Sequence, residues 1–285
     1  MATELLADDG FRNGFMLKGL NSLRDGHGSI RSFRLNEKEP RWYLCQWNSK
    51  YNLIDGDFTV SKDRYNICDV SKSLTVIGNR ELVFELNAEK EYKTQRTESE
   101  PWPHLLIEQE ITENNRVRDL KKIECSARFR LLEFKSYMQG QEKQYHAAQF
   151  VWVVTFKDAN PDSPSYGSFI WVVLCPFDSR YDFAPLFTQQ DKALPDGEFI
   201  YSFAGCDFLE KPLWGGDGVN LYIDLYPHIG RILACAQSHG FMQGSRAEDL
   251  VVSSTNMGFE ITGTFRCRIS VENPKIMIEK KEEKE

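Results

Sequence analysis

Long apolar runs are missing from this sequence, and their absence excludes one class of protein. A helix that spans a bilayer needs roughly 18 or more consecutive apolar residues, and no segment of the 285 residues approaches that length. Residues 1–11 are polar and lack the basic-then-apolar order of a secretion signal. We therefore expect a protein without a membrane partner, located in the cytoplasm unless an export signal has been removed.

Positive charge is also scarce. The chain has 35 Lys and Arg residues against 42 Asp and Glu residues, a formal net charge of −7. Negative proteins are repelled by phosphate backbones. The charge balance therefore argues against a nucleic-acid partner.

Paired cysteine motifs are absent as well. The seven cysteines stand singly, with no Cys-x-x-Cys pair and no histidine placed to complete a zinc site. Asp178 and Asp182 fall short of the roughly six to eight oxygens that calcium needs, and no Gly-x-Ser-x-Gly nucleophile motif occurs. We predict reduced, mostly buried thiols, as in a reducing compartment, and no metal or other cofactor.

Alternation of apolar and polar residues is the strongest pattern present. It predicts a half-buried strand over residues 123–131 and a second long strand over residues 259–271. Shorter alternating segments occupy residues 219–226, 80–86 and 104–109. Strands are therefore expected along most of the chain.

Two nearly continuous apolar runs lie in the middle of the chain. Residues 147–156 and 168–177 are rich in Val, Ile, Phe and Trp, which is typical of strands covered on both faces. The turn-forming residues between them predict a hairpin with a long loop. Residues 227–239 have apolar residues at helical spacing between Pro227 and Gly240, which predicts the clearest helix.

No repeat or low-complexity linker divides the sequence. We predict one domain over residues 1–278 and a charged, frayed tail over residues 279–285. Many half-buried strands need a second layer, so the predicted fold is an all-β jelly-roll β-sandwich of two antiparallel sheets with one short helix. A closed barrel is the alternative.

The order of three segments resembles a known superfamily. Trp-Pro-His-Leu-Leu-Ile-Glu-Gln (102–109), the apolar hairpin, and Asn-Met-Gly-Phe-Glu-Ile-Thr-Gly-Thr-Phe (256–265) follow one another as in concanavalin A-like jelly rolls. That superfamily includes lectins, glucanases and polysaccharide lyases. The Glu-x-Asp-x-x-Glu pattern of its glucanases is absent. Of the lyase patterns, Gln144-Tyr145-His146 matches Gln-x-His, whereas Arg128-Phe129-Arg130 does not match Arg-x-Glu-x-Arg. The resemblance implies a carbohydrate ligand.

Four residues are catalytic candidates for elimination from a uronate-containing glycan. Arg128 and Arg130 share the polar face of one strand and could hold a carboxylate. His146, or a nearby tyrosine such as Tyr222, would then abstract the proton at C5. The alternatives are surface ion pairs for the two arginines and a structural hydrogen bond for the histidine.

The predicted binding residues come from strands and from loops. Trp102, His104 and Glu108 would place an aromatic ring, an imidazole and a carboxylate along one strand edge, as suits a sugar. Core packing is the alternative for Trp102. The other candidates are Gln149, Asp178, Arg180, Trp214 and Asp224.

Two of these candidates have open alternatives. Asp178 and Arg180 could instead close a turn by pairing with each other. Asp224 could join Glu260 as an acid–base pair, or both could lie on solvated sheet faces.

Taken together, these residues predict a carbohydrate-active protein that binds an oligosaccharide or polysaccharide on an open sheet face. A glycan lyase and a glycoside hydrolase are its enzymatic forms. A non-catalytic carbohydrate-binding module and a protein-interaction β-sandwich are the alternatives, since a fold does not choose among them.

Overall fold

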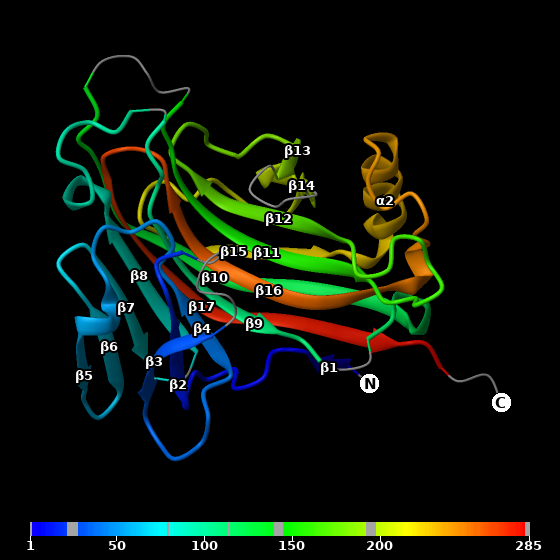
Figure 1. The fold of residues 1–285 in the computed structure, drawn as a ribbon, viewed down its shortest axis with the longest axis horizontal. Coiled ribbons are helices and arrows are strands. Elements are labelled where there is room, and N and C mark those ends of the chain that lie inside the picture. Colours follow the sequence, from blue (N-terminus) through cyan, green and yellow to red (C-terminus); the bar gives the residue numbers. More distant parts are fainter. Residues whose placement is uncertain are drawn as a thin grey trace.

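Two large β-sheets packed face to face form the structure, a computed structural model (Figure 1). It describes residues 2–21, 28–78, 80–97, 99–112, 115–139, 145–191 and 198–282. Most strands pair with antiparallel neighbours, and a single α-helix lies at one end of the sandwich within these ranges. The predicted fold class, a jelly-roll β-sandwich with one helix, is confirmed.

Within the described residues, sheet A has eight strands, and all of their pairs are antiparallel. In spatial order they are β15 (Val219–Asp224), β10 (Leu120–Ser136), β17 (Phe265–Lys280), β8 (Glu81–Asn87), β7 (Lys72–Ile77), β6 (Arg64–Cys68) and β5 (Asp57–Val60), with β1 (Ala2–Glu4) also paired to β17.

Sheet B has nine strands in the part of the chain that the structure describes. In spatial order they are β13 (Phe187–Asp191), β14 (Glu198–Ser202), β12 (Phe169–Asp178), β11 (Ala148–Asp158), β16 (Leu250–Ile261), β9 (His104–Glu110), β4 (Trp42–Cys45), β2 (Gly14–Lys18) and β3 (Ser29–Arg34). The β12–β14 and β2–β4 pairs are parallel, so sheet B departs from the purely antiparallel arrangement that we predicted.

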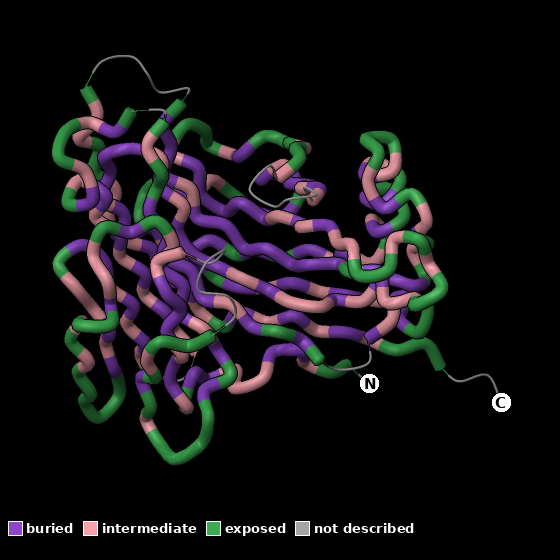
Figure 2. The backbone as a smooth tube through the Cα atoms, viewed as in Figure 1, coloured by how far each residue is buried: buried purple, intermediate pink, exposed green. Residues whose placement is uncertain are grey.

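Side-chain alternation positions the core between the sheets. In β10, Ile123, Cys125 and Phe129 are buried, while Arg128 and Arg130 point outward, as predicted. Figure 2 shows buried residues along the middle strands of both sheets. The predicted hairpin is β11 and β12, which pair along most of their length.

The helix forms where proline and the apolar spacing favour it. A 3₁₀ turn, η5 (Tyr226–His228), carries Pro227 in its first turn and leads into α2 (Ile229–Ser238). Ile229, Ile232 and Leu233 are buried on one face of the helix, which packs beside β14. The predicted helix is confirmed. Five further 3₁₀ turns are described: η1 (Leu53–Asp55), η2 (Ala88–Lys90), η3 (Val117–Asp119), η4 (Gly205–Asp207) and η6 (Ala247–Asp249).

The predicted long strand over residues 259–271 is wrong. The chain leaves sheet B after Ile261, turns through residues 262–264, and enters sheet A at Phe265. A Cβ on Gly263 would lie 2.5 Å from the Phe265 ring, so a larger residue at the corner would have to displace that ring. Alternation runs on through the corner because the strands on either side face the same core.

β17 also continues to Lys280, so residues 279 and 280 belong to a strand and not to the predicted tail.

The cysteines are free, as predicted. Cys45, Cys125, Cys175 and Cys267 are buried, whereas Cys206 is exposed. Burial raises the pKa of each buried thiol above its usual value. Within the described ranges, no helix combines the length and apolar character needed to span a bilayer.

Thiol reactivity should follow this burial. At pH 8 a thiol-specific reagent should modify Cys206 first and leave the four buried cysteines unmodified, because the thiolate is the nucleophile and burial disfavours it. Under denaturing, non-reducing conditions all seven thiols should react. Mass spectrometry of the labelled protein checks both results, and a denatured count of three or fewer would contradict the free thiols.

Candidate functional site

The outer face of sheet B carries its own apolar cluster, separate from the core between the sheets. Its buried members are small or aliphatic, and larger rings pack against them. We call these residues the outer-face cluster: Cys45, Leu106, Val151, Val153, Cys175 and Ala184, with Tyr43, Trp47, Trp171 and Val173 packed on them. Apolar residues on both faces of β11 and β12 explain the nearly continuous apolar runs in the sequence.

A row of polar residues crosses four strands at one end of this cluster. Gln149 on β11 stands in register with Asp178 on β12 and with Glu260 on β16, and Glu260 stands opposite His104 on β9. Gln149 Nε2 donates to Asp178 Oδ2 at 2.8 Å, and His104 Nε2 lies 3.9 Å from Glu260 Oε2. We call Asp178, Gln149, Glu260 and His104 the polar row.

Two tryptophan rings pack beside the imidazole of His104 in the polar row. The His104 ring centroid lies 5.9 Å from those of Trp47 and Trp102, and the Arg96 guanidinium lies 5.6 Å from the Trp102 centroid. Trp102 is 37% exposed, so the core-packing alternative for this residue is wrong. An aromatic ring, an imidazole and a carboxylate meet here.

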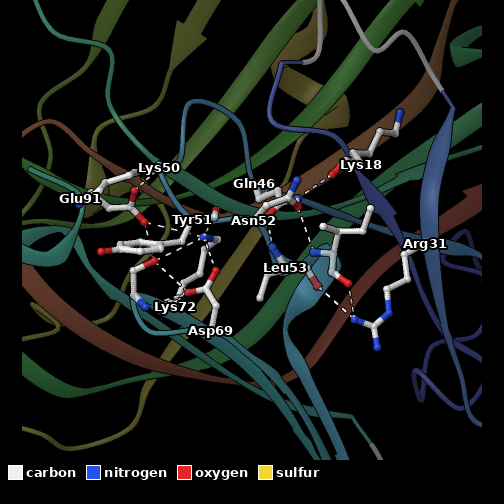
Figure 3. A network of polar contacts seen from close by, with 12 residues as sticks. Lys18, Arg31, Gln46, Lys50, Tyr51, Asn52, Leu53, Asp69, Lys72 and Glu91 are labelled. Atoms are coloured by element: carbon white, nitrogen blue, oxygen red, sulfur yellow. Dashed lines mark hydrogen bonds and ion pairs between the residues drawn. The ribbon is translucent and has the colours of Figure 1, made fainter.

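A second carboxylate lies further along β9. Glu108 Oε1 forms an ion pair of 2.8 Å with Nζ of the buried Lys18 on β2, and this Nζ lies 4.4 Å from the Tyr43 ring centroid. Burial, and then the charge of Glu108, raise the pKa of the Cys45 thiol. The backbone of Lys18 is held in place as well, because Gln46 Nε2 donates a hydrogen bond to the Lys18 carbonyl oxygen at 3.1 Å (Figure 3).

The structure gathers half of the predicted site residues at this face. His104, Glu108, Gln149 and Asp178 lie on adjacent strands of sheet B, Trp102 precedes β9, and Arg180 follows β12. Arg180 Nη2 donates to Asp178 Oδ2 at 2.6 Å, and the Asp178 side chain is almost fully buried. The turn-closing alternative therefore describes the contact between Asp178 and Arg180.

Trp214 lies near the end of β12, where its ring meets aromatic side chains that belong to or pack against the core between the sheets. Its ring centroid is 5.1 Å from that of Phe177 and 5.3 Å from that of Phe134, and its Nε1 donates to the Tyr181 carbonyl oxygen at 3.4 Å. The indole packs against these rings but is 36% exposed.

Four predicted residues lie on the other sheet. Arg128 and Arg130 both pair with Glu272 on β17, at 3.4 and 3.3 Å, which is the surface ion-pair alternative. The Tyr222 hydroxyl donates to the Glu124 carboxylate. Asp224 Oδ1 accepts from the backbone N–H of residues 123 and 226, a structural role on sheet A, while Glu260 is on sheet B.

The predicted elimination site is not assembled. His146 is buried just before β11, where its Nδ1 lies 2.6 Å from the Thr262 carbonyl oxygen, whereas Arg128, Arg130 and Tyr222 belong to sheet A. Gln144 lies outside the described residues. Period-two alternation shows which side of a strand is apolar, but it does not show to which of two sheets the strand belongs.

Sequence reasoning missed Lys18, Tyr43, Trp47 and, as a partner of His104, Glu260. β2 and β4 have only five and four residues, too few for alternation to stand out. In the part of the chain that the structure describes, His, Cys, Asp and Glu form no group of three or more that could hold a metal ion.

Comparisons with known proteins give similarity in structure only. No family model matches the sequence, and no curated protein is significantly similar to it. The family 12 xyloglucanase from Bacillus licheniformis aligns with a TM-score of 0.43 and 12% identity over 79% of this chain and 97% of its own. Endoglucanase cel12A from Rhodothermus marinus aligns with a TM-score of 0.40 and 10% identity over 77% of this chain and 93% of its own. Endoglucanase 3 of family GH12 from Trichoderma harzianum aligns with a TM-score of 0.38 and 10% identity over 84% of this chain and 91% of its own.

These three neighbours are named as endoglucanases and a xyloglucanase. Their low identity and low TM-scores leave function to be argued from the site itself.

Proposed function

We propose that this protein binds an oligosaccharide or polysaccharide along the outer face of sheet B. The observation that carries the proposal is the combination of rings and polar groups on that face. Tyr43, Trp47 and Trp171 pack on the outer-face cluster, and Trp102 stands at its edge beside the polar row. Sugar rings stack on aromatic faces while their hydroxyls need hydrogen-bond donors and acceptors.

The spacing of the polar groups favours a chain over a single sugar. His104 and Glu108 project from the same side of β9, four residues apart, which corresponds to about 13 Å along a strand. His104 contacts Trp102 and Glu260, and Glu108 contacts Lys18. A ligand that touches both places must contain several sugar units.

Binding should therefore depend on the polar-row end of sheet B. Affinity electrophoresis against xyloglucan, β-glucan, xylan and polygalacturonate should show retention by at least one polymer. Trp102→Ala and His104→Ala should each weaken that retention by about tenfold, equivalent to ~1.4 kcal/mol, because each removes a ring from the same contact.

Arg128→Ala serves as the control, because Arg128 lies on sheet A and should leave retention unchanged. Retention of no polymer, or retention that neither sheet B variant weakens, would contradict glycan binding at this face.

Glycoside hydrolysis uses one carboxyl group as proton donor and a second as base or nucleophile, at a separation of about 5–10 Å. Glu260 stands opposite His104, whereas Glu108 lies four residues further along β9, about 13 Å away, and its carboxylate pairs with Lys18 on β2. Glu108 and Glu260 are therefore too far apart to act as such a pair, and the outer face of sheet B supports glycan binding without hydrolysis by these two groups.

A further inference from the structure

A pocket of about 410 Å³ opens on sheet A, the sheet opposite the proposed glycan face. Strands β6, β7, β8 and β17 and the turn at residues 69–71 form its walls. Among its lining residues are Asn66, Asp69, Ser73, Glu85, Asn87 and Arg266. Pockets that bind small molecules begin at about 300 Å³.

One wall of the pocket is held in place by a buried ion pair. Lys72 Nζ lies 2.6 Å from Asp69 Oδ2, and its side chain is fully buried. Lys72 Nζ also donates a hydrogen bond to the Tyr51 carbonyl oxygen at 2.7 Å (Figure 3). Asp69 Oδ1 accepts from the backbone N–H of Ser71 at 2.8 Å, which fixes the turn. A wall that is already ordered loses little conformational entropy when a ligand binds.

The charges around the pocket compensate one another. Arg266 Nη2 lies 2.8 Å from Glu85 Oε1, and Lys72 pairs with Asp69. The same contact with Glu85 raises the pKa of Arg266. A charged ligand would have to compete with these pairs, and a neutral ligand would not. The charge balance therefore favours a neutral ligand.

The remaining polar groups are suited to hydroxyls. Asn66, Ser73 and Asn87 line the pocket with amide and hydroxyl groups, which donate and accept without net charge. Asn87 Oδ1 is buried without a hydrogen-bond partner in the described structure, so a donor is missing there. None of the residues that line the pocket is aromatic, so it offers no stacking platform for a flat ring.

We propose that this pocket is a second ligand site, which takes a neutral, hydroxyl-rich small molecule of about the size of one sugar unit. It is separate from the outer face of sheet B and does not depend on the function proposed for that face. The ligand hydroxyls would contact Asn66, Ser73 and Asn87 while the ion pairs stay intact.

Titration of the whole chain with D-glucose, D-xylose and myo-inositol, followed by ligand-observed NMR, tests this site. At least one of these neutral probes should bind, and glucuronate and inorganic phosphate should bind at least tenfold more weakly. Asn87→Ala should weaken binding of the neutral probe about fivefold or more, and Ser73→Phe, which fills the pocket, should abolish it.

Asn220→Ala is the matched control, because Asn220 is an asparagine on β15, at the opposite edge of sheet A. The Asn220→Ala variant should bind the neutral probe with the same affinity as the unmodified chain. Circular dichroism and melting curves check folding, and if Ser73→Phe fails to fold, Asn87→Ala alone decides.

Three results would overturn the proposal: no neutral probe binds, the charged probes bind more tightly, or Asn87→Ala binds as well as Asn220→Ala. Trp102→Ala distinguishes the two sites. It should weaken polysaccharide retention but leave the small probe bound, and loss of the small probe in this variant would place it on sheet B instead.

Discussion

Replacing Lys72 with methionine is expected to lower the free energy of unfolding by about 3–5 kcal/mol, because it leaves buried carboxylates without a counter-charge. The Lys72 side chain is completely inaccessible, and its Nζ lies 2.6 Å from Asp69 Oδ2 and 3.8 Å from Glu91 Oε1. Those carboxylates are themselves 9% and 2% exposed. Water cannot replace the lost ammonium there. Equilibrium unfolding in urea measures the change.

Lys90→Met is the matched control. Lys90 Nζ lies 3.7 Å from Glu89 Oε2, but the two side chains are 54% and 40% exposed, so the loss should stay under about 1 kcal/mol. Adding Asp69→Asn and Glu91→Gln to Lys72→Met should recover part of the stability, since the unpaired charges are then removed. Equal losses for the two lysine variants would show that burial of the Lys72 network does not matter.

Phe150→Ala is the second substitution with a large expected cost, about 3–5 kcal/mol. The Phe150 ring is fully buried on β11. Its centroid lies 5.2 Å from that of Phe84 and 5.8 Å from that of Phe129, both on sheet A, and 5.1 Å from that of Phe259 on sheet B. Truncation therefore opens a cavity where the two sheets meet.

The control for this variant is Phe187→Ala on the edge strand β13, where the ring is 47% exposed. Its cost should be well below that of Phe150→Ala, because solvent already covers much of the ring. Phe150→Leu, which keeps part of the volume, should fall between them. Urea denaturation orders the three variants, and a similar loss at both phenylalanines would contradict a core centred on Phe150.

Local patterns predicted the helix and the strands β8–β12 and β15, but not the short strands β1–β7, β13 and β14. In β10 the alternation placed Ile123 and Phe129 inward and Arg128 outward, and each was confirmed because a half-buried strand repeats every second residue. The helix was predicted because Pro227 and Gly240 mark its limits. The corner at residues 262–264 was not predicted, because alternation continued across it.

The candidate site was predictable only within single strands. His104 and Glu108 could be assigned to one side of one strand from their even spacing. Their partners Glu260 and Lys18 come from β16 and β2, and pairing between strands that are distant in sequence is set by the whole sandwich. For the same reason Arg128 and His146, each plausible alone, proved to belong to different sheets.

The position of β17 has a consequence for synthesis of the protein on the ribosome. This strand lies in the middle of sheet A, between β10 and β8, and also pairs with β1, yet it follows all three in sequence. A nascent chain that has produced β8 and β10 therefore holds strand edges whose partner does not yet exist. Unpaired edges are templates for aggregation. Efficient production should depend on rapid completion of translation or on chaperones that shield these edges until β17 emerges.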